Sequence, residues 1–114
     1  KPTPLLVPLV EEGITGGAVA REVLKHYLWE WREKIDTLLL GCTHYPLLEG
    51  LIKEMFPHWR VVNSAQPLAQ DLKHFLHLGG ENELFLHFTD KTAFLEGMVE
   101  RITLKGKVKE ITVR

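Results

Sequence analysis

Residues 35–48 read IDTLLLGCTHYPLL, and this stretch decides the fold. Its first part, Ile35 to Leu40, is a short apolar run, polar at Asp36 and Thr37, of the kind that fills a strand buried on both faces of a parallel sheet. Gly41 interrupts the run, and Pro46 suits the first turn of a helix that follows. The stretch therefore predicts a strand, a turn and a helix, which together are typical of an α/β fold.

A thiol, a hydroxyl and an imidazole occupy the turn, in the order Cys42-Thr43-His44. The carboxyl end of a strand is where α/β sheets bind their ligands, and the start of a helix favours a thiolate or a bound carboxylate. Cys42 is the only cysteine of the chain, and a lone cysteine is more often a small buried apolar residue. Position alone thus leaves a reactive and a structural thiol both open.

The segment Gly41-Cys42-Thr43-His44-Tyr45-Pro46 resembles the second cysteine motif of glutamate racemases. Related aspartate racemases are similar at Gly-Cys-Thr but typically carry an acid where His44 stands, so the histidine favours glutamate. A second segment, Pro8-Leu9-Val10-Glu11-Glu12-Gly13, resembles the family segment that ends in Pro-Leu-Val-Glu-Glu-Gly. Thr3, where many members have a cysteine, and Asn63, where they often have Asp, depart from the pattern.

The resemblance implies racemisation without a cofactor or metal, by two bases on opposite sides of the α-carbon. It makes Cys42 one base, with His44 tuning that base or contacting the substrate amine. Thr43 and Cys42 would bind the substrate carboxylate, and Glu11 would orient His44. The opposing cysteine belongs in the family to an N-terminal domain that these 114 residues do not contain. We therefore expect the C-terminal portion of a glutamate racemase that supplies D-glutamate for peptidoglycan, and we expect it to be inactive by itself.

The fold class that we expect is α/β, a three-layer sandwich with a mostly parallel sheet that forms the C-terminal part of a two-domain racemase fold. Residues 1–80 would be the second α/β domain, in part, and residues 81–114 a return segment resembling the part that packs on the missing N-terminal domain. Thr15 is a possible N-cap for the first helix. The expected strands cover residues 4–10 (centred on Leu5–Leu9), 35–40, 60–62, 83–90 and 108–113, and the expected helices cover residues 18–34, 46–56, 67–78 and 92–104.

The composition is that of an ordinary globular protein, with 45% hydrophobic and 25% charged residues and a net charge of −1. This balance argues against a nucleic-acid binder, and no apolar run approaches the roughly 18 residues of a membrane span. One cysteine excludes an internal disulfide and fits a reducing cytosol. The first residue is Lys1 rather than Met, and we expect the chain to be a portion of a longer protein.

Other interpretations stay open beside this one. The chain could be an aspartate or other amino-acid racemase of the same superfamily, or a hydrolase that uses a cysteine and a histidine. Cys42 and His44 could bind zinc, although a structural zinc site needs four ligands. It could also be an interaction module, since it carries three tryptophans. The partners that we expect are glutamate and the N-terminal racemase domain, with no nucleic acid and no membrane, and the sequence leaves a homo-oligomer open.

Overall fold

The computed structural model describes residues 1–75, 97 and 99 of the chain. The chain divides into two compact units, Lys1–Leu76 and His77–Arg114, and every element discussed below lies in the first. Gly97 and Val99 of the second unit are helical. The strands predicted at 83–90 and 108–113, and the rest of the helix predicted at 92–104, lie outside the described residues.

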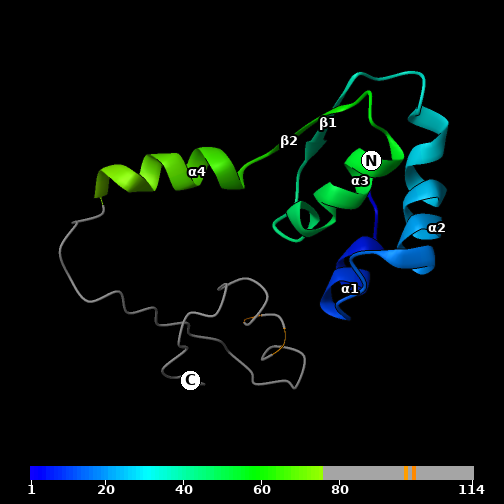
Figure 1. Cartoon of the computed structure of the whole chain (residues 1–114), viewed down its shortest axis with the longest axis horizontal. Helices are drawn as coiled ribbons and strands as arrows, with labels where there is room; N and C mark the ends of the chain where they lie inside the picture. The colour runs from blue at the N-terminus through cyan, green and yellow to red at the C-terminus, as the bar shows by residue number, and fades with distance from the viewer. Residues whose placement is uncertain (76–96, 98, 100–114) are drawn as a thin grey trace. The chain divides into compact units, whose positions relative to one another are not determined.

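The first unit combines short helices with a parallel pair of strands (Figure 1). In β1 and β2, Leu38 lies opposite Val61 and Leu40 lies opposite Asn63. The helical segment between the strands makes the crossover that a parallel pair requires, so the strand, helix and strand predicted between residues 35 and 62 are confirmed. The elements in chain order are α1 (Leu6–Glu11), α2 (Gly17–Leu28), η1 (Trp29–Trp31), β1 (Thr37–Leu40), η2 (Tyr45–Leu48), α3 (Glu49–Met55), β2 (Arg60–Asn63), α4 (Ala65–Leu72) and η3 (Lys73–Phe75), where η denotes a 3-10 helix.

The first apolar segment is helical, so the strand predicted near Leu5–Leu9 is wrong. Helix α1 buries Leu6, Leu9 and Val10, which share one face at the i, i+3 and i+4 spacing. Pro8 is the third residue of this helix. The first turn of a helix tolerates proline because its N–H groups have no intrahelical partner there. A short apolar run fits either element, and packing on a helical neighbour selected the helix.

A glycine-rich turn leads into α2, the helix that was predicted from residue 18. Gly13 and Gly17 have φ of 74° and 78°, a left-handed conformation that glycine adopts without steric cost. Thr15 is not the N-cap, because Gly16 holds that position and no side chain caps the helix. The regular helix ends at Leu28 and continues only as η1, so the predicted end at Lys34 is also wrong.

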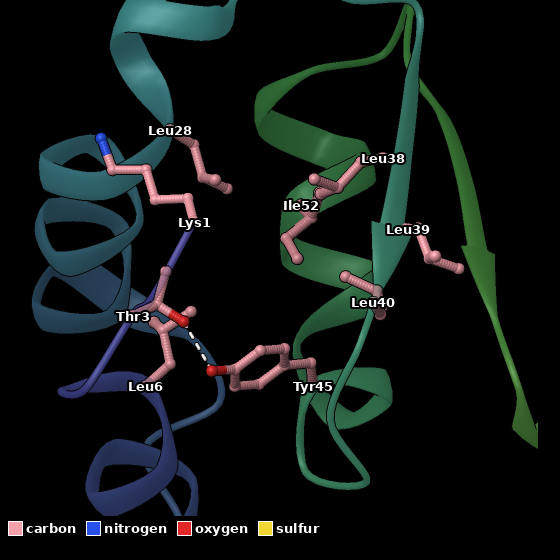
Figure 2. Close-up of a pocket in the computed structure, with 9 residues that line it drawn as sticks. All are labelled: Lys1, Thr3, Leu6, Leu28, Leu38, Leu39, Leu40, Tyr45 and Ile52. Atoms are coloured by element: carbon pink, nitrogen blue, oxygen red, sulfur yellow. Dashed lines mark hydrogen bonds between the residues drawn. The ribbon is translucent and has the colours of Figure 1, made fainter.

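One hydrophobic core joins α1, α2, α3 and one face of β1. Phe56 anchors it, with 1% of its surface exposed and its ring stacked on Trp59 at 4.1 Å between centroids. Leu40 is buried and Leu38 packs against the core, whereas Leu39 points to the other side of β1 and is 70% exposed (Figure 2). Among the described residues, helices therefore cover one face of this strand. The buried members of the cluster are Leu6, Leu9, Val10, Ala20, Leu24, Tyr27, Leu28, Leu40, Leu48, Leu51, Ile52, Phe56 and Trp59.

The last described helix, α4, is capped by the strand before it. The side-chain oxygen of Asn63 accepts hydrogen bonds from the backbone N–H groups of Ala65 at 2.9 Å and Gln66 at 3.4 Å. If the helix is counted from Ser64, Asn63 is the N-cap residue. The two N–H groups are then the N2 and N3 donors, which an N-cap side chain normally accepts. None of the residues of α4 is buried. In the part of the chain that the structure describes, no helix has the length and apolar character needed to cross a membrane.

Candidate active site

The segment Gly41–Pro46, called the signature from here on, lies where the sequence placed it, at the carboxyl end of β1. Gly41 leaves the strand, and half-buried Cys42 follows it. The turn is closed by backbone hydrogen bonds from Tyr45 N–H to the Cys42 carbonyl at 3.3 Å and from Leu47 N–H to the His44 carbonyl at 3.1 Å. The chain therefore passes directly from the strand into η2, and this holds the thiol and the imidazole at one edge of the sheet.

His44 connects a thiol to a carboxylate through its two ring nitrogens. Its Nδ1 lies 3.8 Å from the Cys42 sulfur, within the range of a hydrogen bond to sulfur, and 3.3 Å from the Thr43 hydroxyl. Its Nε2 lies 3.4 Å from a carboxylate oxygen of Glu11. The structure thus brings together the four residues that the sequence singled out, namely Cys42, Thr43, His44 and Glu11.

Glu11 reaches this site from an element that the sequence did not predict. It is the last residue of α1 rather than the end of a strand, and α1 packs against η2. That packing carries the carboxylate to the imidazole across a long separation in the chain.

The arrangement can share one proton between sulfur and nitrogen. The Glu11 carboxylate lies beside Nε2 of His44 and favours a proton on that nitrogen, which leaves Nδ1 as an acceptor for the S–H of Cys42 or the O–H of Thr43. Transfer of the thiol proton to Nδ1 leaves a thiolate beside an imidazolium that faces a carboxylate. The side chains of His44 and Glu11 are 31% and 55% exposed, so solvent screens their attraction.

The same residues do not form a metal centre in the described part of the chain. Within residues 1–75, 97 and 99, no group of three or more Cys, His, Asp and Glu side chains has the geometry to hold a metal ion. The zinc interpretation of Cys42 and His44 therefore gains no support from these residues.

One neighbour of the signature was not identified from the sequence. Thr3 is 8% exposed, and its hydroxyl shares a 2.5 Å hydrogen bond with the Tyr45 hydroxyl (Figure 2). This bond ties the segment before α1 to the first residue of η2. The only signal in the sequence was that Thr3 is a polar residue just before an apolar run. This position does not identify the hydroxyl group to which Thr3 is hydrogen-bonded.

Fold and site together define an α/β protein with a thiol, an imidazole and a carboxylate in a row at the carboxyl edge of a parallel sheet. No family model matches the chain. It is 45% identical over 102 residues to the glutamate racemase of Aquifex pyrophilus and 43% identical over 102 residues to that of Aquifex aeolicus. Each match covers 90% of this chain and 40% of the relative. The solved structure of glutamate racemase from Thermus thermophilus superimposes with a TM-score of 0.75 at 33% identity, over 98% of this chain and 45% of that one.

The chain is therefore homologous to glutamate racemases over most of its length and matches the C-terminal portion of these relatives. The resemblance of the signature and the α/β fold class are confirmed. The chain spans about 40% of the length of the curated relatives that it matches first.

Proposed function

We propose that this chain supplies one of the two bases of a glutamate racemase and that the rest of that enzyme supplies the other. The observation that carries the proposal is the row formed by Cys42, His44 and Glu11, with separations of 3.8 Å and 3.4 Å. An imidazole backed by a carboxylate is a suitable group to take the proton of a neighbouring thiol. Cys42 would then be the base, His44 the group that tunes it, and Glu11 the residue that positions His44.

The proposed step is a proton transfer at the α-carbon of glutamate. In one direction the Cys42 thiolate takes the α-proton and becomes a thiol, while the electron pair of the C–H bond stays on the α-carbon. An acid on the opposite face then donates a proton, which inverts the centre. In the other direction the Cys42 thiol is the acid, so the same group serves alternately as base and acid.

Substrate recognition would fall to the turn itself. The hydroxyl and backbone N–H of Thr43, with the backbone of Cys42, would hold the substrate carboxylate, and His44 in place of an acid favours glutamate over aspartate. The product D-glutamate would serve peptidoglycan synthesis in the bacterial cytoplasm. Because a second base is needed, we propose that the isolated chain has no measurable racemase activity.

A chimera tests this proposal directly. The portion of the Aquifex pyrophilus racemase that precedes its match would be joined to residues 1–114, and conversion of D-glutamate to L-glutamate would be measured without added pyridoxal phosphate or metal. The expected result is turnover by the chimera and none by the 114-residue chain. Cys42→Ala should remove activity by a factor on the order of 10²–10⁴, the contribution of a positioned acid or base.

His44→Ala should impair turnover, more in one direction if His44 serves only the Cys42 base. The matched control is His26→Ala, because His26 is an exposed histidine on α2, and it should leave turnover unchanged. Racemisation by the isolated chain that disappears with Cys42→Ala would mean that both bases lie within these 114 residues. A chimera that turns over aspartate in preference to glutamate would support the alternative substrate.

A further inference from the structure

Two consecutive residues of the signature contact opposite ends of α1. His44 lies beside Glu11, the last residue of the helix, with 3.4 Å between its Nε2 and a carboxylate oxygen. Tyr45 shares its 2.5 Å hydrogen bond with the hydroxyl of Thr3, which precedes the helix (Figure 2). Thr3 is itself joined to the start of α1, because its carbonyl accepts a hydrogen bond from the N–H of Leu6 at 3.0 Å. The signature therefore holds α1 at two points, one just before its first residue and one at its last.

Apolar packing does not by itself fix where α1 lies on η2. The buried residues of α1 belong to the same apolar cluster as Leu48 of η2. Hydrophobic contacts are non-directional, so they hold the helix against η2 without fixing its position along its own axis. A hydrogen bond between two hydroxyl groups depends on distance and angle. The bond between Thr3 and Tyr45 therefore fixes the start of α1 relative to η2.

The position of the start of α1 also decides the position of Glu11. Helix α1 has six residues, so its two ends lie only about 8 Å apart, and a shift at one end is carried to the other. Tyr45 also closes the turn that carries the thiol, through the hydrogen bond from its N–H to the Cys42 carbonyl. The contact between Glu11 and His44 is partly exposed and not short, so it depends on how the two chain segments are placed.

We propose that Thr3 is a positioning residue of the candidate active site. Through its hydrogen bond with Tyr45, Thr3 holds α1, and with it Glu11, against the signature. The carboxylate then stabilises the imidazolium that forms when the proton of Cys42 moves from Sγ to Nδ1 of His44 and the electron pair of the S–H bond stays on sulfur. The inference rests on the proposed function, because it takes the row Cys42, His44 and Glu11 as the path of this proton.

Alkylation of Cys42 by iodoacetamide measures the thiolate in the 114-residue chain without requiring turnover. Cys42 is the only cysteine, so the gain in mass reports a single site. The rate at about pH 7 is divided by the rate at about pH 10, where an ordinary thiol is ionised. This ratio follows the fraction of thiolate at neutral pH. A change in access to the thiol alters both rates and leaves the ratio unchanged.

Removal of either hydroxyl should lower the ratio. Thr3→Val keeps the shape of the side chain and should lower the ratio about two- to fivefold, which is the range for the loss of a partly exposed ion pair. Tyr45→Phe should have the same effect, and Thr3→Ser, which keeps the hydroxyl, should retain the ratio of the unmodified chain. The matched control is Thr37→Val at an exposed threonine of β1, which should change nothing. If Thr3→Val unfolds the chain, Tyr45→Phe decides.

Glu11→Gln shows whether Thr3 acts through Glu11. This substitution should lower the ratio by itself, and Thr3→Val should then have no further effect. A full effect of Thr3→Val in the Glu11→Gln chain would overturn the proposal, because the hydroxyl would then act by another route.

A ratio that falls with Glu11→Gln but not with Thr3→Val or Tyr45→Phe would also overturn the positioning role, even if both variants melt at a lower temperature. That result would leave the row Cys42, His44 and Glu11 intact. A ratio that Glu11→Gln does not change would refute the row itself and, with it, both proposals. The two kinds of failure are therefore distinguishable.

Discussion

Helices α3 and α4 have similar sequence patterns and opposite environments. Both fall within predicted helices, at residues 46–56 and 67–78, and each has a stripe of apolar residues at helical spacing, namely Leu48, Leu51 and Ile52 in the first and Leu68, Leu72 and Phe75 in the second. In α3 the stripe is buried, with Leu51 at 7% and Ile52 at 1% exposure. In α4 and the turn that follows, Leu68 is 59% exposed and Phe75 is 78% exposed.

The difference shows that a stripe identifies the face that a helix can bury, whereas a partner decides whether the face is buried. Helix α3 leads into Phe56 and packs against η2 and α2. The stability of the first unit should therefore be concentrated in α3 and its neighbours. The following predictions test that contrast, from the largest effect to the smallest.

Phe56→Ala should cost about 3–5 kcal/mol of the free energy of unfolding, because it removes a ring that is 1% exposed and leaves a cavity beside Trp59. The matched variant Phe75→Ala removes the same side chain from a position that is 78% exposed, and it should change stability by no more than about 0.5 kcal/mol. Urea unfolding followed by circular dichroism measures both. Equal costs for the two substitutions would mean that Phe75 is buried in solution.

Asn63→Ala should lower the free energy of unfolding by about 1 kcal/mol, because the Asn63 side chain contacts both α3 and α4. Its oxygen caps α4, and its amide nitrogen donates to the carboxylate of Glu49, the first residue of α3. Glu49 keeps its ion pair with Lys53, with 2.6 Å between the charged atoms, so its carboxylate is not left unpaired. Urea unfolding at neutral pH is the measurement, and Ser64→Ala is the control, because the Ser64 side chain makes no cap hydrogen bond.

Asn63→Asp separates the cap from the contact with Glu49. Aspartate is as good a cap as asparagine, but its carboxylate would face that of Glu49. The variant should be less stable than the unmodified chain at neutral pH, and the difference should shrink as the pH falls and the two carboxylates become protonated. A difference that does not depend on pH would contradict this explanation.

The smallest effect is expected at an exposed ion pair. A hydrogen bond from Lys1, with its positive charge, holds the pKa of Glu30 below its ordinary value. A carboxyl group with a lowered pKa in the folded state stabilises the fold above its unfolded pKa, and this contribution is lost as the pH falls through the folded pKa. Both side chains are exposed, so solvent and salt screen the pair. Glu30→Gln should lower the melting temperature slightly at low ionic strength and neutral pH, and not at all in acid or high salt.

The sequence predicted the part of the fold that surrounds the signature. The apolar run of Leu38, Leu39 and Leu40 and the glycine after it define a strand and its end, and Pro46 marks the helical segment that follows. These signals are local, because a buried strand and a helix start each need particular residues at particular positions. For the same reason Cys42 could be placed at the carboxyl edge of the sheet before any coordinates were known.

The error at Leu5–Leu9 has the opposite cause. Leu6, Leu9 and Val10 fit a helical face, but so short an apolar run also fits a buried strand, and Pro8 is tolerated in the first turn of a helix as well as at a sheet edge. The sequence offers no local signal that separates the two structures. Contact with η2 and α2 decides in favour of the helix.

The sequence by itself therefore determined the chemistry of the turn, which is a thiol, a hydroxyl and an imidazole at the end of a strand. It could do so because the side-chain types, and the residues that end a strand and begin a helix, are all found in one short run of consecutive residues. What only the tertiary structure decided is which distant groups meet that chemistry. Glu11 lies 3.4 Å from His44, and Thr3 shares a hydrogen bond with Tyr45, because α1 packs on η2. Among the described residues, packing also left Leu39 exposed on one face of β1 while it buried Leu40 on the other. Burial depends on which neighbours fill the space around a side chain, and no stretch of consecutive residues specifies those neighbours.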